Sequence, residues 1–546
     1  MDKARESSEE QARAFAAFAE QLVRELEPLQ LQYNESTWLA NVTGQPEHEE
    51  ASARLDNQIR LIFARAEPYR RLLAWRDSGA VVDPVLARQL ELLIHTYRAH
   101  QIPTESIARM VEIEKALESR FNNFRAELGG RRVTDNEIRL VLQRSDDSAE
   151  RRAAWEASKQ IGGQVDADLK TLVRLRNDAA RQVGFDNYYG MMLTLDELDE
   201  TELFALLDEL DAGTAPLFEH YRAGLDQELT RRFRVGPSEI RPWHMNDPFF
   251  QEAPPTAVDL DPHFRDRALE EMTERFFAAI GLEVADLLAR ADLYEKPGKS
   301  QHAFCLQVDR GDDIRVLCNL RPNEQWMSTL LHEFGHAVYD KYLDRSLPYL
   351  LRTPAHTLTT EASAMLFGRL SKNAAWLHRY AGLDREAAAA AGEATRRATR
   401  EQLLVQTRWC LVMCHMERAL YRDPEQDLDT LWWDLVERFQ RVGRPEGRRA
   451  PDWASKIHFS VAPVYYQNYM LGEIMASQLQ RHLLDRVLGG GADAWDRYVS
   501  SPDVGRYLTE HLFRPGKSLD WRGAIQRTTG AALSAGAFVD ELAGRN

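Results

Sequence analysis

The stretch WMSTLLHEFGHAVYDKYL, residues 326–343, combines the pattern of an amphipathic helix with two histidines four positions apart. The apolar residues that set the helical period are Met327, Leu330, Leu331, Phe334, Ala337 and Val338. His332 and His336 therefore project from one helix face, one turn from each other. This spacing lets two imidazole nitrogens bind one zinc ion at about 2.0–2.1 Å, with Glu333 beside the open position as a general base. The alternative is an ordinary helix that carries two polar histidines.

A catalytic zinc site also needs a third protein ligand and one position left open for water. Tyr342 stands six residues after the second histidine, so the metzincin pattern with a third histidine there is excluded. Glu361 lies 25 residues after His336 at the start of a new helical run, and a glutamate on an adjacent helix is the gluzincin arrangement. His356 is the other candidate, which we interpret as a loop histidine. The sequence thus predicts one Zn2+ per chain, bound by His332, His336 and Glu361.

The surrounding chain predicts a mainly α fold with a small β hairpin beside the zinc helix. Two β-rich runs, HAFCLQVD at 302–309 and IRVLCNL at 314–320, are joined by a turn at 310–313. Apolar stripes at helical spacing are formed by Phe15, Phe18, Leu22 and Leu26 and by Leu55, Ile59, Ile62 and Phe63. Further helices are expected around 105–127, 150–182, 201–232, 265–290, 363–382, 385–421, 426–441 and 465–487. No clear linker or internal repeat is present, so we expect a single domain over residues 1–546.

Composition limits the possible partners and the compartment. The 546 residues are 44% hydrophobic and 28% charged, which is typical of a globular protein. A formal charge of −16 disfavours nucleic acid and anionic membranes as partners, and no run of residues is long and apolar enough to span a bilayer. The amino-terminal residues lack the apolar core of a signal peptide. Together with only four cysteines, this predicts reduced thiols and a cytoplasmic location.

Several motifs resemble the family of angiotensin-converting enzyme and its relatives, thimet oligopeptidase and oligoendopeptidase F. The HEFGH sequence followed by a glutamate about 25 residues later is similar to that of the family. His302 and Ala303 resemble the edge-strand pair that holds the peptide backbone there. The segment SKIHFSVAPVYYQNYMLGE, 455–473, resembles its Lys-x-His segment with a tyrosine cluster, and QYNESTWLANVTG, 32–44, resembles an early segment more weakly. The specific motifs fall within about 295–475.

The resemblance implies a helical, two-halved peptidase domain with a deep substrate channel and an amino-terminal lid at about 1–130. It implies that short peptides are the substrates, because a channel excludes folded proteins. A tetrahedral intermediate needs neutral hydrogen-bond donors for its oxyanion, and His458, Tyr469 and Tyr466 are the candidates. Lys456, with Tyr465, is the candidate for binding the free carboxylate of a substrate.

The sequence also departs from the family pattern. Counted without gaps from His458, the position of the family's transition-state tyrosine falls on Asn468, whereas Tyr469 matches if one residue is inserted. The family has a second tyrosine in this segment, and the choice between Tyr465 and Tyr466 for it stays open. Three further family residues are replaced or missing. Gln467 stands where the family has a chloride-linked arginine, and Met365 stands where the family has an aspartate behind the metal ligands. The family's carboxylate-binding glutamine has Met245 as its nearest match. We expect other carboxylates to take over the role of that aspartate.

Three functions are compatible with these motifs. The favoured one is zinc-dependent release of dipeptides from the carboxyl end of short peptides. An oligoendopeptidase that cuts internal bonds is the alternative. Lys456 favours dipeptide release if it binds the free carboxylate of the substrate; the other interpretation is that it is a solvated loop lysine. The third possibility, an inactive peptide-binding homologue, is disfavoured because Glu333 and all three predicted ligands are present.

Overall fold

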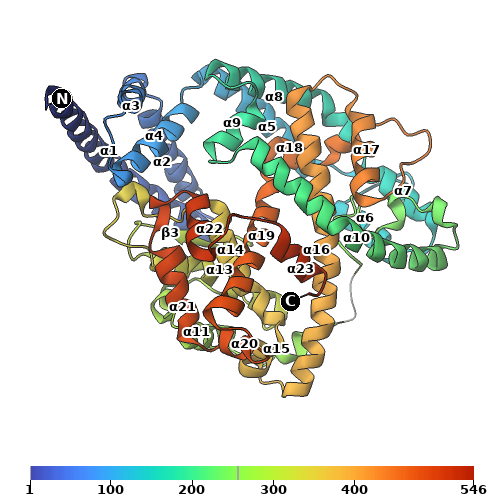
Figure 1. Cartoon of the computed structure of the whole chain (residues 1–546). Coiled ribbons are helices and arrows are strands. Elements are labelled where there is room, and N and C mark those ends of the chain that lie inside the picture. Colours follow the sequence, from blue (N-terminus) through green and yellow to red (C-terminus); the bar gives the residue numbers. More distant parts are fainter. Residues whose placement is uncertain (1, 255–257, 546) are drawn as a thin grey trace. The chain divides into compact units, whose positions relative to one another are not determined.

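The computed structural model describes residues 2–254 and 258–545 and is built almost entirely from helices (Figure 1). In this part of the chain, strands occur only in two antiparallel pairs, so the expected mainly α fold is confirmed. The chain divides into two compact units, each assembled from separate stretches. The first unit holds Met1–Gln101, Val258–Arg396 and Leu471–Ala537, and the second holds Ile102–Ala257, Arg397–Met470 and Phe538–Asn546.

The first unit combines four amino-terminal helices, a central group that includes a hairpin, and a carboxy-terminal group. The amino-terminal helices are α1 (Asp2–Thr43), α2 (Pro46–Phe63), α3 (Ala66–Ser78) and α4 (Pro84–Ala99). The central elements are α11 (Leu269–Ala279), α12 (Ala285–Arg290), β3 (Phe304–Gln307), β4 (Ile314–Leu317), α13 (Glu324–Lys341), α14 (Thr357–Gly368) and α15 (Ala374–Trp376). The carboxy-terminal helices are α20 (Ala494–Tyr498), α21 (Pro502–Leu508) and α22 (Trp521–Thr529).

The second unit is helical apart from a short hairpin. Its elements are α5 (Thr104–Asn123), β1 (Ala126–Leu128), β2 (Arg131–Val133), α6 (Asp135–Arg144), α7 (Ser148–Ser158), α8 (Gly162–Gln182), α9 (Tyr188–Leu195), α10 (Glu200–Phe233), α17 (Leu428–Gln440) and α18 (His458–Val461). Three helices continue from one unit into the other: α16 (Arg385–Arg422), α19 (Tyr466–His482) and α23 (Gly536–Leu542).

The predicted elements are mostly present, with differences at their ends. The hairpin before the histidine helix is confirmed, since β3 pairs antiparallel with β4. The helices expected at 150–182 and 265–290 are each interrupted, and the β1–β2 hairpin was not predicted. As the sequence predicts, no helix within 2–254 and 258–545 is long and apolar enough to cross a membrane.

Helix α1 supports the β hairpin of the first unit. Trp38 packs with Leu317 of β4, and its ring makes an edge contact with Phe304 of β3, with centroids 6.0 Å apart. The side chain of Asn34 donates a 2.8 Å hydrogen bond to the carbonyl of Val308, just beyond β3. These contacts fix the hairpin from the side of α1, and β3 in turn contacts α13.

A close approach of α13 to α14 brings the predicted metal ligands together. A Cβ placed on Gly335 would lie 2.6 Å from Cα of Ala364 and 3.0 Å from the carbonyl oxygen of Ser363. Only glycine therefore fits at this crossing. The hydroxyl of Ser363 donates a 3.0 Å hydrogen bond to the carbonyl of Gly335, which ties the two backbones together.

Replacement of Gly335 by alanine is expected to destabilise the protein. The added methyl group overlaps backbone atoms, which cannot rotate away, so we expect the free energy of unfolding to fall by about 1–3 kcal/mol. The matched control is Gly224→Ala in α10, where a Cβ has open space. There the same change is expected to stabilise by about 0.5–1 kcal/mol. Denaturation curves that move in the same direction for both variants would contradict this account.

Candidate active site

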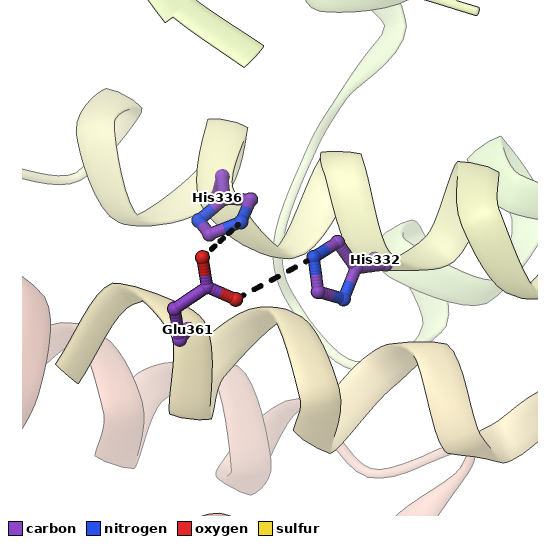
Figure 2. Close-up of side chains that lie close together, drawn as sticks. All are labelled: His332, His336 and Glu361. Carbon is purple, nitrogen blue, oxygen red and sulfur yellow. Dashed lines mark ion pairs between the residues drawn. The ribbon is translucent and has the colours of Figure 1, made fainter. Parts of the chain in front are cut away.

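Three potential metal ligands meet between α13 and α14. The imidazoles of His332 and His336 leave α13 on the side of α14, and the carboxylate of Glu361 rises from α14 toward both (Figure 2). Nε2 of His332 lies 3.8 Å from Oε2 of Glu361, and Nε2 of His336 lies 4.0 Å from Oε1. The structure thus brings together the three residues that the sequence predicts as ligands.

This donor set fits a zinc ion. Two imidazoles and one glutamate are the His2Glu set of catalytic zinc sites, and two atoms bound to one ion at about 2.0–2.2 Å cannot be more than about 4.4 Å apart. Burial lowers the pKa of His332 to about 4, and burial together with His332 lowers the pKa of His336 to about 3. Both rings are therefore neutral at pH 7 and have a lone pair for a metal. No second group of this kind occurs in the described residues.

Glu333 lies beside the triad with the properties of a general base. Its side chain borders the same cavity, although the residue is only 7% exposed. Burial, and then the charge of Glu361, raise the pKa of Glu333 to about 8, while a backbone hydrogen bond from Cys305 lowers it. A cation held by the triad would lower this pKa again, toward the neutral range where a base is most useful.

A hydroxyl orients one of the histidines. Nδ1 of His336 lies 2.7 Å from Oγ1 of Thr360. With Nε2 facing the metal position, Nδ1 carries the proton and donates it to the hydroxyl. We expected a carboxylate in this role for the ligands, but for His336 the partner is the threonine that precedes Glu361. Met365, which stands where an aspartate was expected, instead packs against α19, where a Cβ on Gly472 would lie 3.1 Å from its sulfur.

An open cavity of about 630 Å3 lies in front of the triad within the first unit. One wall is the edge of β3, from Ala303 to Gln307. The sheet has only two strands, β3 and β4, and Leu317 of β4 forms a β-bridge with Asp292 on the side away from β3. The opposite edge of β3 therefore pairs with no strand among the described residues. An unpaired edge beside a catalytic site can bind an extended peptide through main-chain hydrogen bonds.

The predicted edge pair lies just before this strand. Ala303 lines the cavity, whereas His302 is exposed and does not line it. The amide of His302 donates a 3.4 Å hydrogen bond to the hydroxyl of Ser300. The backbone of Cys305 already bonds to Glu333, and the carbonyl of Gln307 accepts a 3.3 Å hydrogen bond from Asn34, so Ala303 is the member of the predicted pair that borders the cavity, and the role of the pair stays a prediction.

His356 has a structural role at the start of α14. It is buried, and its Nδ1 accepts a 3.0 Å hydrogen bond from the amide of Leu358. Its side chain therefore caps the helix that carries Glu361. The sequence suggested a loop histidine. The hydrogen bond of the cap satisfies this polar side chain in its buried position.

Two family models match the chain. The model described as angiotensin-converting enzyme matches residues 6–244, and the model of peptidase family M3 matches residues 286–544, which include the triad and Glu333. Both families are gluzincin zinc metallopeptidases. The chain belongs to this superfamily. It is therefore an enzyme of the zinc metallopeptidase class, and such enzymes act on peptides. No curated protein matches the sequence.

The second unit of this metallopeptidase contains the predicted histidine and tyrosine cluster. The rings of His458 and Tyr466 lie 4.9 Å apart, and Tyr469 lies 5.5 Å from Tyr466 and 5.3 Å from Tyr465, measured between centroids. Burial, and then the charge of Lys456, lower the pKa of His458 to about 4, so the ring is neutral. The structure brings these four aromatic residues together within the unit.

Their exposure differs and limits their roles. Tyr466 is 5% exposed, and its hydroxyl accepts a 3.3 Å hydrogen bond from the indole of Trp409. Tyr465 and Tyr469 are half-buried and keep accessible surface. Asn468, where the ungapped count places the transition-state tyrosine, is buried. A donor to the oxyanion has to be accessible to the substrate, so Tyr469 stays the candidate and the register stays a prediction.

Lys456 is a buried cation and not a solvated loop lysine. The residue is 9% exposed, and its ammonium lies 5.1 Å from the ring centroids of both Phe249 and Trp409. The same group donates a 2.8 Å hydrogen bond to Oε1 of Gln251. Burial lowers the pKa of Lys456 to about 8, although Asp247 opposes this shift.

Gln251 is the polar partner that the sequence did not reveal. Met245, the nearest match by sequence, is buried, and its sulfur lies 4.0 Å from a guanidinium nitrogen of Arg222. Gln251 lies six residues later, in an irregular segment whose amides bond to the buried carboxylate of Asp247. An irregular backbone has no period, so position along the chain could not identify the residue that faces Lys456.

Removal of the Thr360 hydroxyl is expected to weaken zinc binding. Thr360→Val keeps the shape of the side chain but leaves Nδ1–H of His336 without its acceptor, so the zinc dissociation constant should rise about 10–100-fold. Thr360→Ser retains the hydroxyl and serves as the control. Competition with a chromophoric chelator measures both constants, and equal affinities of the valine variant and the wild type would show that the hydroxyl does not support the ligand.

Proposed function

We propose that this metallopeptidase uses one zinc ion per chain to release dipeptides from the carboxyl end of short peptides. The observation that carries the proposal is the buried ammonium of Lys456, which has aromatic neighbours and a hydrogen bond to Gln251. An ammonium in a desolvated site favours a carboxylate ligand. A fixed anchor for the terminal carboxylate would restrict cleavage to a set distance from the carboxyl end of the substrate.

Chemistry at the triad requires a metal and a base. Zinc bound by His332, His336 and Glu361 would supply a Lewis acid that polarises the scissile carbonyl and acidifies a water molecule. Glu333 accepts the proton of the attacking water and returns it to the leaving amine. The edge of β3 aligns the substrate backbone through main-chain hydrogen bonds.

Neutral donors complete the stabilisation of the oxyanion. Tyr469 is assigned this role because it is the tyrosine of α19 that combines the expected register with accessible surface. His458 is neutral, and its buried Nδ1 has no hydrogen-bond partner among the described residues. It is assigned as a second donor. Tyr466, 6.0 Å from the Lys456 ammonium by its ring centroid, is assigned to the carboxylate pocket instead, together with Tyr465.

A second candidate function is an oligoendopeptidase that cuts internal bonds. The observation in its favour is that the model of peptidase family M3, and not the angiotensin-converting enzyme model, matches the part that carries the triad. Such an enzyme would not need the carboxyl terminus of its substrate. The two candidates therefore differ in how they treat peptides with a blocked end.

Glu333→Gln is expected to separate metal binding from chemistry. The amide cannot accept the proton of water, so turnover should fall by at least about 10²-fold while one zinc per chain is retained. Metal content is measured by atomic spectrometry, and turnover is measured with a set of short peptides. The control variant His332→Ala should lose both zinc and activity. Near-normal turnover of Glu333→Gln would remove this residue from the mechanism.

Amidation of the carboxyl end is expected to slow cleavage if Lys456 binds the carboxylate. The loss of one charge-assisted hydrogen bond should reduce kcat/KM about 10–100-fold for the amidated peptide. Lys456→Met keeps the length and packing of the side chain without its charge, and it should abolish the difference. Mass spectrometry of the products shows whether dipeptides are released.

The control is Lys115→Met, which removes an exposed lysine of the same unit. The preference of the wild type for a free carboxylate should also decline as pH rises through about 8, because the ammonium of Lys456 then loses its proton. A ratio of rates cancels changes at other groups. Equal rates on free and amidated peptides, with internal cuts, would establish the oligoendopeptidase function.

A further inference from the structure

The cavity of the first unit contains a carboxylate that the proposed chemistry does not use. Three acidic side chains line it: Glu333, Glu361 and Asp340. The first is assigned as the base and the second as a metal ligand. Asp340 lies on α13 one turn beyond His336 and borders the same cavity.

Asp340 is buried without a direct partner. The residue is 9% exposed, and none of the described residues donates a hydrogen bond to it or forms an ion pair with it. The charge of Arg345 acts on Asp340, but its Nε lies 3.5 Å from a carboxylate oxygen of the exposed Asp312. Burial raises the pKa of Asp340 to about 7 against the weaker effect of Arg345. A buried acidic group in this state gains most from a positively charged ligand.

The other polar groups that line this part of the cavity do not neutralise the carboxylate of Asp340. Arg310 lines the cavity, but its guanidinium donates a 3.0 Å hydrogen bond to the carbonyl of Tyr349 and lies over the ring of that tyrosine. Gln307, at the end of β3, has a buried amide nitrogen without a hydrogen-bond partner among the described residues. An unpaired acceptor and an unpaired donor thus border one cavity, which is the pattern of a site for a polar ligand.

We propose that Asp340 binds a positively charged group of the substrate, carried by the second residue on the amino side of the scissile bond. The group is either the side chain of lysine or arginine or the free amino terminus of a short peptide. This inference rests on the proposed peptidase function and specifies its substrate class.

The position follows from the geometry of helix and peptide. Asp340 is four residues beyond His336, which corresponds to about 6 Å along the helix axis. An extended peptide on the edge of β3 advances about 3.3 Å per residue. For a peptide that runs along α13, a group at Asp340 therefore belongs to a residue about two positions from the bond that is cut.

The charge of the site selects the amino side of the bond. In a substrate that loses a dipeptide, the second residue on the carboxyl side carries the terminal carboxylate. A buried aspartate beside that carboxylate would repel it and leave two desolvated negative charges together. The second residue on the amino side has no such charge, and it can present a cation to Asp340.

Four tetrapeptides with free carboxyl ends separate the two sources of the cation. The first residue is lysine or norleucine, which lacks the ammonium, and the amino terminus is free or acetylated. The acetylated pair measures the effect of the side chain, and the two norleucine peptides measure the effect of the terminus. We expect kcat/KM to be about 10–100-fold higher for at least one cationic peptide than for its neutral partner, as for one charge-assisted hydrogen bond.

Asp340→Asn should reduce this ratio to about one, because the amide keeps the shape of the side chain but not its charge. The matched control is Asp344→Asn, which removes a carboxylate four residues further along the chain, beyond the end of α13 and outside the cavity. Dissociation constants measured by calorimetry on zinc-loaded Glu333→Gln should show the same preference without turnover.

The outcomes distinguish the two proposals. Cleavage without any preference for a cation, or a preference that survives in Asp340→Asn, overturns the role of Asp340 and leaves the peptidase function in place. Failure to cleave any of the four peptides, or longer ones, overturns the proposed function itself.

Discussion

The close packing of α13 on α14 at Gly335 is the constraint on which the catalytic geometry depends. The ligands come from both helices, and a zinc ion tolerates only small changes in the distances between them. A side chain at position 335 would meet the backbone of α14 at Ala364 and separate Glu361 from the histidines. On its other side, α14 meets α19 with a second glycine, Gly472, whose Cβ position is 3.2 Å from Cβ of Glu361. The helix that carries the third ligand is therefore confined from two directions within the first unit.

The electrostatics of this unit explain why the ligands are ready for a metal. Burial makes protonation of both imidazoles unfavourable, and it also raises the pKa of Glu361. A divalent cation at this site would stabilise the ionised form of Glu361, and the neutral histidines keep a lone pair for the same ion. When Nε2 of His336 offers its lone pair to the metal, Nδ1 carries the proton and donates a hydrogen bond to the hydroxyl of Thr360, which orients the ring. In this chain a hydroxyl lies behind His336, and position 365 is a methionine that packs against Gly472.

The sequence predicted the triad because the rules that place it are local. The period of α13 fixes His332 and His336, and the need for a third ligand points to Glu361. It could not predict that Lys456 is buried, because its neighbours Phe249 and Trp409 are remote in the sequence. The hairpin beside α13 was predictable from two β-rich runs and a turn. The β1–β2 hairpin has only three residues per strand, and its first two residues fall at the end of the helix expected at 105–127.

Asp340 shows the same limit inside a helix whose existence was predicted. It follows the apolar residues of α13, where a charged side chain normally marks the solvated face. Its burial arises from the hairpin and from the chain that precedes α14, both of which line the cavity with it.

The two proposed recognition groups, Asp340 and Lys456, carry opposite charges and are both buried. The carboxylate of Asp340 would favour a cationic group, and the ammonium of Lys456 would favour a carboxylate. A desolvated charge gains more from such a partner than an exposed one, so burial, and not charge alone, makes each of them a candidate for recognition.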